Sequence, residues 1–298
     1  MQLQQGATIG ITCPAGYVSK ERVEYAVKVL NDWGYKVCLG NTVGNEFHYF
    51  SGTDQERLVD LQQMMDDPAI DAILMGRGGY GVSRIIDGLD LTAFKAKPKW
   101  LCGFSDITVL HSHILAQAGI PTLHSPMCGA FKPETELSAH ILSLKNALAG
   151  KGDEYVLPLS AHNRVGTTNG ILTGGNLSLL VHLTGSVSEV DFTGKILFIE
   201  DLGEHLYHVD RMLLHLKRAG KLDNLAGLLV GSFTDMEDTD RPFGQTLEEI
   251  IFDKVKEYNY PVAFNMPCGH QETNYTLALG AEHSLNVSKE GSMLVRHP

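Results

Sequence analysis

A serine near the middle of the first half of the chain has the surroundings of a nucleophile. Residues 103–107 read Gly-Phe-Ser-Asp-Ile, after a buried apolar run and before a segment with helical periodicity. A sharp turn from a strand into a helix exposes a serine hydroxyl and points N–H groups at developing negative charge. The usual G-x-S-x-G pattern has glycine where this chain has Ile107. A serine that only caps a helix is therefore the alternative interpretation of Ser105.

A glycine-rich loop follows the apolar run 70–75. Residues 76–81 read Gly-Arg-Gly-Gly-Tyr-Gly. Without side chains, such a backbone can approach a ligand closely and present bare N–H groups, as an oxyanion hole requires. A tight turn between a strand and a helix is the structural alternative. The spacing also fits G-x-G-x-x-G, but the motif follows the third expected strand rather than the first, so we do not expect a nicotinamide cofactor.

Two adjacent acids, Glu200 and Asp201, end the apolar run 195–199. Alternate residues of a strand face opposite sides, so the two carboxylates should point apart and only one can reach a given partner. A solvated turn is the alternative. His270 lies in a loop after the expected strand 262–264, where a histidine is most often only a surface or core-edge residue.

The histidine pairs do not suggest a metal site. His111 and His113 are two residues apart and therefore point to different helix faces. His205 and His208 share a face with Glu204 nearby, but no third ligand is evident in the sequence. We therefore expect neither a metal nor another cofactor.

The elements that must position these residues alternate in type. In the first half, short apolar runs alternate with segments of helical period, which predicts an α/β fold with a parallel sheet covered by helices on both sides. Functional groups collect at the carboxyl ends of such strands. Residues 53–56 form a capping box that opens a helix, and Gly34 ends the preceding one. The expected strands of this half cover residues 8–13, 35–39, 70–75 and 100–104.

The second half is richer in strand-like segments. The polar, turn-rich stretch 148–169 predicts a linker together with the entry strand of a second domain, so we expect a first domain over residues 1–147 and a second over 170–298. In the second domain we expect strands at 195–199 and 226–230. The apolar stripe Leu206, Val209, Leu213 and Leu216 predicts a helix that ends at Gly220.

Composition excludes several classes of protein. The 298 residues carry a formal net charge of −11, which argues against a nucleic-acid partner because phosphate binding needs a basic face. No signal peptide is evident, and no apolar run reaches the roughly 18–20 residues that span a bilayer. Five scattered cysteines without a CxxC pair indicate reduced thiols. We therefore expect a cytoplasmic protein with no membrane association.

In order along the chain, these segments resemble the LD-carboxypeptidase family of serine peptidases, which trim bacterial cell-wall muropeptides. The resemblance covers nearly the whole sequence. The matching segments are Cys13-Pro14-Ala15-Gly16, Arg77-Gly78-Gly79-Tyr80-Gly81, Gly103-Phe104-Ser105-Asp106, Thr173-Gly174-Gly175-Asn176-Leu177, Phe198-Ile199-Glu200-Asp201, and Gly269-His270 with Asn274 and Gly280.

The resemblance implies a flavodoxin-like N-terminal domain and a smaller, swivelling β/α domain, with a homodimer as the assembly. It implies a Ser-Glu-His triad, which falls on Ser105, Glu200 and His270. The implied activity is hydrolysis of an L,D-peptide bond that releases the terminal D-alanine of murein tetrapeptides. The chain lacks the extra length of the related microcin-immunity peptidases, which favours the muropeptide branch.

Physical reasoning adds roles for three other residues, and the resemblance suggests a fourth, Asn176, which lies in one of the matching segments. Backbone N–H groups of Gly78 and Asp106 can bind the tetrahedral oxyanion. A carboxypeptidase must also bind the free carboxylate of its substrate, and Arg77 is the candidate cation because it lies in the glycine loop. Arg77 could instead only hold the loop by pairing with an acid. Asn176 is a further candidate for contact with substrate.

A second class of function stays open at this point. The chain could be a two-domain amidotransferase-like or ligand-binding α/β protein without peptidase activity. Amidotransferase chemistry would place cysteine at the elbow, where this chain has Ser105. For the third residue of the stem peptide, diaminopimelate and lysine are the two alternatives.

Overall fold

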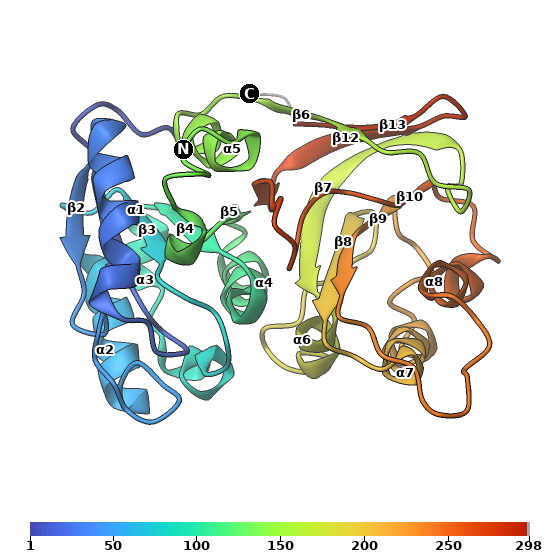
Figure 1. Ribbon diagram of the computed structural model, residues 1–298, viewed down its shortest axis with the longest axis horizontal. Helices are drawn as coiled ribbons and strands as arrows, with labels where there is room; N and C mark the ends of the chain where they lie inside the picture. The colour runs from blue at the N-terminus through green and yellow to red at the C-terminus, as the bar shows by residue number, and fades with distance from the viewer. Residues whose placement is uncertain (297–298) are drawn as a thin grey trace. The chain divides into compact units, whose positions relative to one another are not determined.

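The computed structural model describes residues 1–296 and divides into two units, each built on its own sheet. Unit 1 contains Met1–Lys151 together with Tyr275–Ala278. Unit 2 contains Gly152–Asn274 and the segment that begins at Leu279. Figure 1 shows the course of the chain through both.

The sheet of unit 1 has six strands in the order β11-β5-β4-β3-β1-β2. Neighbours among β1 to β5 are parallel, as predicted. The order β2-β1-β3-β4-β5 is that of flavodoxin-like sheets. The strands are β1 (Thr8–Thr12), β2 (Lys36–Leu39), β3 (Ala72–Met75), β4 (Trp100–Gly103), β5 (Thr122–His124) and β11 (Leu277–Leu279).

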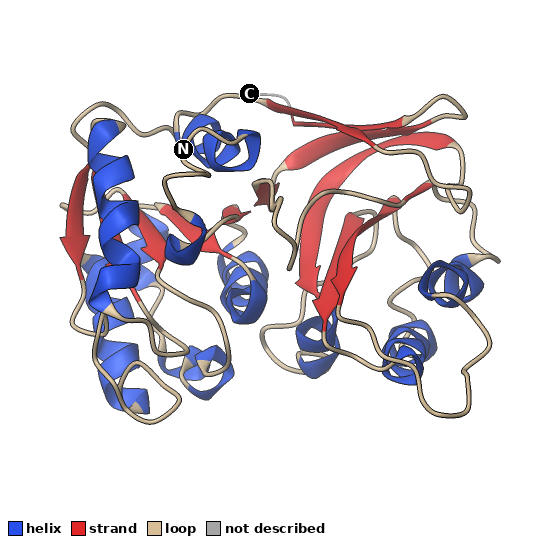
Figure 2. Cartoon of the chain, viewed as in Figure 1, coloured by secondary structure: helices blue, strands red, loops and turns tan. Residues whose placement is uncertain are grey.

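Helices pack around this sheet (Figure 2). They are α1 (Lys20–Asp32), α2 (Asp54–Asp66), α3 (Thr92–Ala96), α4 (Thr108–Ala118) and α5 (Ala139–Leu148). The predicted capping box opens α2: Thr53 accepts from the Glu56 backbone, and the Glu56 side chain accepts from the Thr53 backbone. Gly34 follows α1 with φ +89°, the left-handed conformation that ends helices.

The two loops that carry the candidate functional residues of unit 1 lie at the same edge of its sheet. Every residue of β3 and β4 is buried, as expected for strands covered on both faces. These two strands are parallel neighbours. Their carboxyl ends therefore meet at the same edge, where the glycine loop follows β3 and Ser105 follows β4.

The sheet of unit 2 has seven strands in the order β10-β9-β8-β7-β12-β13-β6. Strands β7 to β10 are parallel, whereas β12, β13 and β6 pair antiparallel. The strands are β6 (Asp153–Leu157), β7 (Gly166–Asn176), β8 (Ile196–Leu202), β9 (Gly227–Thr234), β10 (Val262–Ala263), β12 (Glu282–Val287) and β13 (Ser292–Arg296).

Three helices lie on one side of strands β7 to β10 (Figure 1). They are α6 (Leu177–His182), α7 (Leu206–Arg218) and α8 (Leu247–Val255). The predicted stripe of α7 is confirmed in part, because Val209, Leu213 and Leu216 are its buried residues. Among residues 1–296, no helix combines the length and the hydropathy needed to cross a bilayer.

The observed division of the chain differs from the expected domain boundaries. The stretch 148–169, expected to be a linker with one entry strand, contains β6 and the first residues of β7. The polar composition of β6 reflects an alternation of buried and exposed residues, and β6 pairs with β13 far along the chain. The segment Tyr275–Ala278 belongs to unit 1, where β11 adds to the sheet beside β5. Such long-range pairing has no local signal in the sequence.

Candidate active site

Ser105 occupies a strained backbone position directly after β4. Its φ is +65°, in the left-handed region that residues other than glycine rarely adopt. The 3-10 turn Ser105–Ile107 begins here, and its N-cap is Phe104. Ser105 is therefore not the cap of an ordinary helix. Strain of this kind is concentrated at functional sites, which favours the interpretation of a nucleophile elbow.

The glycine loop lies directly against this serine. A Cβ on Gly78 would stand 2.9 Å from Cβ and 3.1 Å from Oγ of Ser105, closer than side chains normally pack. The carbonyl of Gly78 accepts a hydrogen bond of 3.0 Å from the Gly16 N–H. Glycine at position 78 is therefore needed for the loop backbone to reach the serine.

Asp106 and Arg57 hold the far end of the glycine loop. Oδ2 of the buried Asp106 accepts a hydrogen bond of 2.8 Å from the Val82 N–H. The guanidinium of the buried Arg57 donates to the carbonyls of Gly81 at 3.0 Å and Gly52 at 3.2 Å. The side chain of Asp106 thus ties the loop to the elbow, in addition to the role predicted for its backbone N–H. Arg57 carries no sequence signal, because an arginine in a helix is usually exposed.

The side chain of Arg77 is exposed, and Nη1 donates a hydrogen bond of 2.7 Å to the carbonyl of Tyr17. The guanidinium has five N–H donors, so this contact orients it without using its full capacity. Both interpretations of Arg77, a carboxylate ligand and a support of the loop, are compatible with this geometry.

In unit 2, Glu200 and His270 form a buried pair. Oε2 of Glu200 lies 2.6 Å from Nδ1 of His270. The Glu200 side chain is fully buried, and that of His270 is 13% exposed. With Nδ1–H directed at the carboxylate, Nε2 is the nitrogen that can accept a proton. This is the arrangement of the acid and the base in a catalytic triad.

Asp201 faces a different set of partners. Its carboxylate accepts hydrogen bonds from Nδ2 of Asn176 at 2.8 Å and from the backbone N–H of Ser178 at 2.9 Å. Burial raises the pKa of Asp201 to about 6, against the lowering effect of the Leu202 N–H and the Asn176 amide. Glu200 and Asp201 therefore serve separate networks, as strand alternation predicts.

Asn176 is engaged within unit 2. Its Oδ1 accepts from the Leu179 N–H at 3.3 Å and from the Ser178 hydroxyl at 2.7 Å, so it caps α6. Its amide nitrogen holds Asp201. These contacts assign Asn176 a structural role at the carboxyl end of β7, and its predicted contact with substrate stays a prediction.

The loop that carries His270 is anchored at several points. Gly269 has φ +120°, and a Cβ there would stand 2.5 Å from Oγ of Ser232 and 2.8 Å from Oε2 of Glu200. Oδ1 of Asn274 accepts from the Gly269 N–H at 2.9 Å, and the Thr234 hydroxyl donates to the His270 carbonyl at 2.8 Å. Position 269 must therefore be glycine, and the anchors fix the imidazole beside Glu200.

The other histidines serve other purposes. Nε2 of His111 lies 2.8 Å from the Gly103 carbonyl, and burial lowers the pKa of His111 to about 4. His208 pairs with Glu204 at 2.8 Å. Within residues 1–296, no group of three or more His, Cys, Asp or Glu side chains could hold a metal ion.

Comparisons with known proteins cover both units. Residues 9–125 match the model of the LD-carboxypeptidase N-terminal domain, and residues 169–285 match that of the C-terminal domain. A probable murein peptide carboxypeptidase of Bacillus subtilis is 33% identical over 98% of this chain and 92% of its own length. A murein tetrapeptide carboxypeptidase of Pseudomonas aeruginosa is 31% identical, and the match covers 89% of each chain.

A solved structure has the same fold. The crystal structure of muramoyltetrapeptide carboxypeptidase from Oxalobacter formigenes superposes with a TM-score of 0.89 at 27% identity. The match covers 98% of this chain and 99% of that one. The two family models together span most of the sequence, and relatives above 30% identity align over nearly all of it. The chain belongs to the LD-carboxypeptidase family.

Proposed function

We propose that the chain is a serine carboxypeptidase that hydrolyses an L,D-peptide bond and releases the terminal D-alanine of murein tetrapeptides. The observation that carries this proposal is the buried bond of 2.6 Å between Glu200 and His270, in a chain whose two halves match the LD-carboxypeptidase domains. The strained Ser105 beside the glycine loop supplies a matching nucleophile.

The proposed reaction begins with nucleophilic attack by the serine, assisted by the histidine as general base. The hydroxyl oxygen of Ser105 attacks the carbonyl carbon of the third residue, while Nε2 of His270 takes the hydroxyl proton. Glu200 keeps Nδ1 protonated and stabilises the imidazolium. The oxyanion accepts hydrogen bonds from the backbone N–H groups of Gly78 and Asp106.

Collapse of this intermediate breaks the C–N bond. His270 returns the proton to the amine, which leaves as D-alanine, and the remaining peptide is an ester of Ser105. Water then attacks the ester, again with His270 as base, and Ser105 is regenerated. Since Ser105 belongs to unit 1 and the other two residues to unit 2, the proposal requires both units to contribute to one reaction.

The configuration of the terminal alanine of the substrate offers a test of the proposal. Two muramoyl tetrapeptides that differ only in a terminal D-alanine or L-alanine are incubated with the protein, and free alanine is measured by chromatography. We expect alanine from the D-terminated peptide alone. Equal release from both peptides, or release from neither, would contradict the assignment to an L,D-bond.

Recognition of the substrate carboxylate gives a test of Arg77. Arg77→Met should raise KM for a peptide with a free terminal D-alanine by about tenfold or more, because a charged hydrogen bond contributes roughly 1.5–3 kcal/mol. The amide of the same peptide should be affected little. Steady-state kinetics on the two peptides measure the difference. An equal rise in KM for the free acid and for the amide would mean that Arg77 supports the loop through its hydrogen bond to Tyr17 and does not bind the substrate carboxylate.

The proposed mechanism uses no metal ion. Full activity is therefore expected after exhaustive dialysis against EDTA, measured as D-alanine release per mole of protein. A mock dialysis without chelator is the control. Activity that is lost on chelation and restored by Zn²⁺ would replace the serine mechanism with a hydrolytic metal centre.

We further propose that the protein acts in the cytoplasm as a homodimer. The five cysteines are free, which is typical of a reducing compartment. The dimer is what the family resemblance implies, and a monomeric mass in light scattering at working concentration would contradict it.

A further inference from the structure

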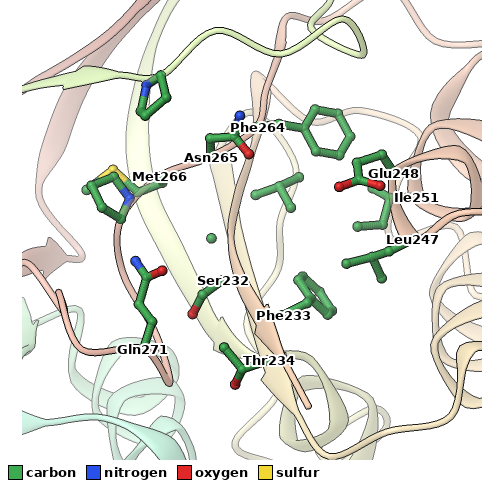
Figure 3. A pocket seen from close by; sticks show the side chains of 14 residues that line it. Ser232, Phe233, Thr234, Leu247, Glu248, Ile251, Phe264, Asn265, Met266 and Gln271 are labelled. Carbon is green, nitrogen blue, oxygen red and sulfur yellow. The ribbon is translucent and has the colours of Figure 1, made fainter. Parts of the chain in front are cut away.

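Unit 2 contains a pocket of about 360 Å³ beside the loop that carries His270. Its walls come from the carboxyl end of β9, from the first turns of α8 and from the segments that flank β10 and His270. Figure 3 shows the side chains that line it. The proposed mechanism assigns no role to this pocket.

One side of the pocket is polar and adjoins the catalytic histidine. Ser232, Thr234 and Gln271 lie on this side in Figure 3. The Thr234 hydroxyl donates to the carbonyl of His270 at 2.8 Å, and Gln271 is the next residue along the chain. A ligand group that enters on this side therefore lies next to the backbone of the base.

The other side is apolar and carries one carboxylate. Figure 3 shows Glu248 on the same side as the rings of Phe233 and Phe264 and the side chain of Leu247. Phe264 is 2% exposed, so the ring is part of the core as well as of the wall. This side can bury methylene groups, which is favourable by roughly 0.8 kcal/mol per CH₂.

The charged side chains of the pocket determine which charge a bound ligand can carry. Among the described residues that line the pocket, Glu248 is the one charged side chain, and none is lysine, arginine or histidine. The neighbouring Glu249 is occupied in the capping box of α8, where its carboxylate accepts from the Thr246 N–H at 2.8 Å. Glu248 is half-buried beside apolar groups, where an opposite charge is attracted more strongly than in water. The pocket therefore disfavours anions and suits a cation on an apolar stem.

We propose that this pocket binds an aliphatic chain that ends in a primary ammonium, with the methylenes between the apolar walls and the ammonium at Glu248. If the proposed function holds, this chain is the side chain of the third residue of the stem peptide, whose carbonyl is attacked. Lysine ends in such an ammonium alone, whereas the terminal carbon of diaminopimelate also carries a carboxylate, which this pocket disfavours because Glu248 is its one charged side chain among the described residues. The polar side of the pocket adjoins the backbone of His270, which is the base in the proposed reaction.

Binding of a small probe tests the pocket without any catalysis. Pentylammonium and 1-pentanol have the same apolar chain and differ in the charge of the head group. In titrations followed by protein NMR, wild-type protein should bind pentylammonium about tenfold more tightly than 1-pentanol, with shifts around Phe233 and Phe264. Glu248→Gln should abolish this difference. Glu154→Gln, which removes the same charge from the exposed face of β6, is the matched control and should retain it.

Equal binding of the two probes, or an undiminished preference in Glu248→Gln, would overturn the proposal. Thermal unfolding of both variants verifies that they fold. Since Glu248 is in the first turn of α8 and outside the capping box, only a small change in melting temperature is expected.

Peptide kinetics then test the link to the reaction. Tetrapeptides with lysine or norleucine at the third position differ in the ammonium alone. We expect kcat/KM of the wild type to favour lysine by about tenfold, and Glu248→Gln to bring the two peptides to parity. Equal kcat/KM in the wild type would show that the pocket does not take the third residue. If neither peptide is cleaved, the proposed function fails, whereas the probe titration still decides whether the pocket binds an alkylammonium.

Discussion

Ser105→Ala is expected to lower kcat for tetrapeptide hydrolysis by about 10⁴-fold or more, with little change in substrate affinity. Loss of the nucleophile in a triad removes the covalent route and leaves only the smaller contributions of the oxyanion hole and of binding. Alanine and serine both carry a Cβ, so the left-handed backbone conformation at φ +65° has a similar free-energy cost for the two residues. The fold should therefore be unaffected. The measurement is kcat from D-alanine release, with calorimetric binding of the tetrapeptide and thermal unfolding measured in parallel.

Ser83→Ala is the matched control. Ser83 lies in unit 1, in the 3-10 turn that follows the glycine loop, and its buried hydroxyl has no hydrogen-bond partner among the described residues. This variant should keep kcat within about twofold, because it removes no hydrogen bond among the described residues and leaves the glycine loop and Ser105 unchanged. Activity of Ser105→Ala close to the wild-type value would exclude Ser105 as the nucleophile.

Glu200→Gln is expected to lower kcat by about 10³–10⁴-fold. A glutamine cannot stabilise the imidazolium, and its amide can hold the imidazole in the wrong tautomer, which has a cost of about 10⁴ in the serine protease triad. The neighbouring Asp201 offers a matched control on the same strand. Asp201→Asn should reduce kcat by less than about tenfold, because its carboxylate accepts from Asn176 and Ser178 and does not contact His270.

Steady-state kinetics of the two variants show which of them loses more of its kcat. The effect of Glu200→Gln should fall on kcat and leave KM nearly unchanged, since the charge is needed only when His270 becomes protonated. A larger loss in Asp201→Asn than in Glu200→Gln would overturn the assignment of the triad acid.

Local patterns predicted the parts of the fold that depend on neighbouring residues. The capping box at Thr53 and Glu56, the end of a helix at Gly34 and the parallel strands of unit 1 all have signals within a few residues. Strand alternation was also sufficient to separate Glu200 from Asp201. The elbow at Ser105 was suggested by its place between an apolar run and a helix, despite Ile107 in place of glycine.

Features that depend on distant segments could not be predicted in this way. The polar stretch 148–169 predicts an entry strand, but it contains no signal for the pairing of β6 with β13. The buried Arg57 reaches the carbonyls of Gly52 and Gly81 from a helix whose sequence suggests a solvent-exposed face. The bond between Asn274 and Gly269 likewise follows from the folded course of the loop. Each of these contacts satisfies buried polar groups, a constraint that local composition does not express.

The most direct test of the account is mass spectrometry of a muramoyl tetrapeptide incubated with purified protein. We predict that the wild type shortens the stem by one alanine and that the product is the tripeptide with a free carboxylate. Ser105→Ala, treated in parallel, should leave the substrate intact. A stem that stays unchanged with the wild type, or one shortened at another bond, would contradict the assignment of this chain as a carboxypeptidase that acts on the terminal D-alanine.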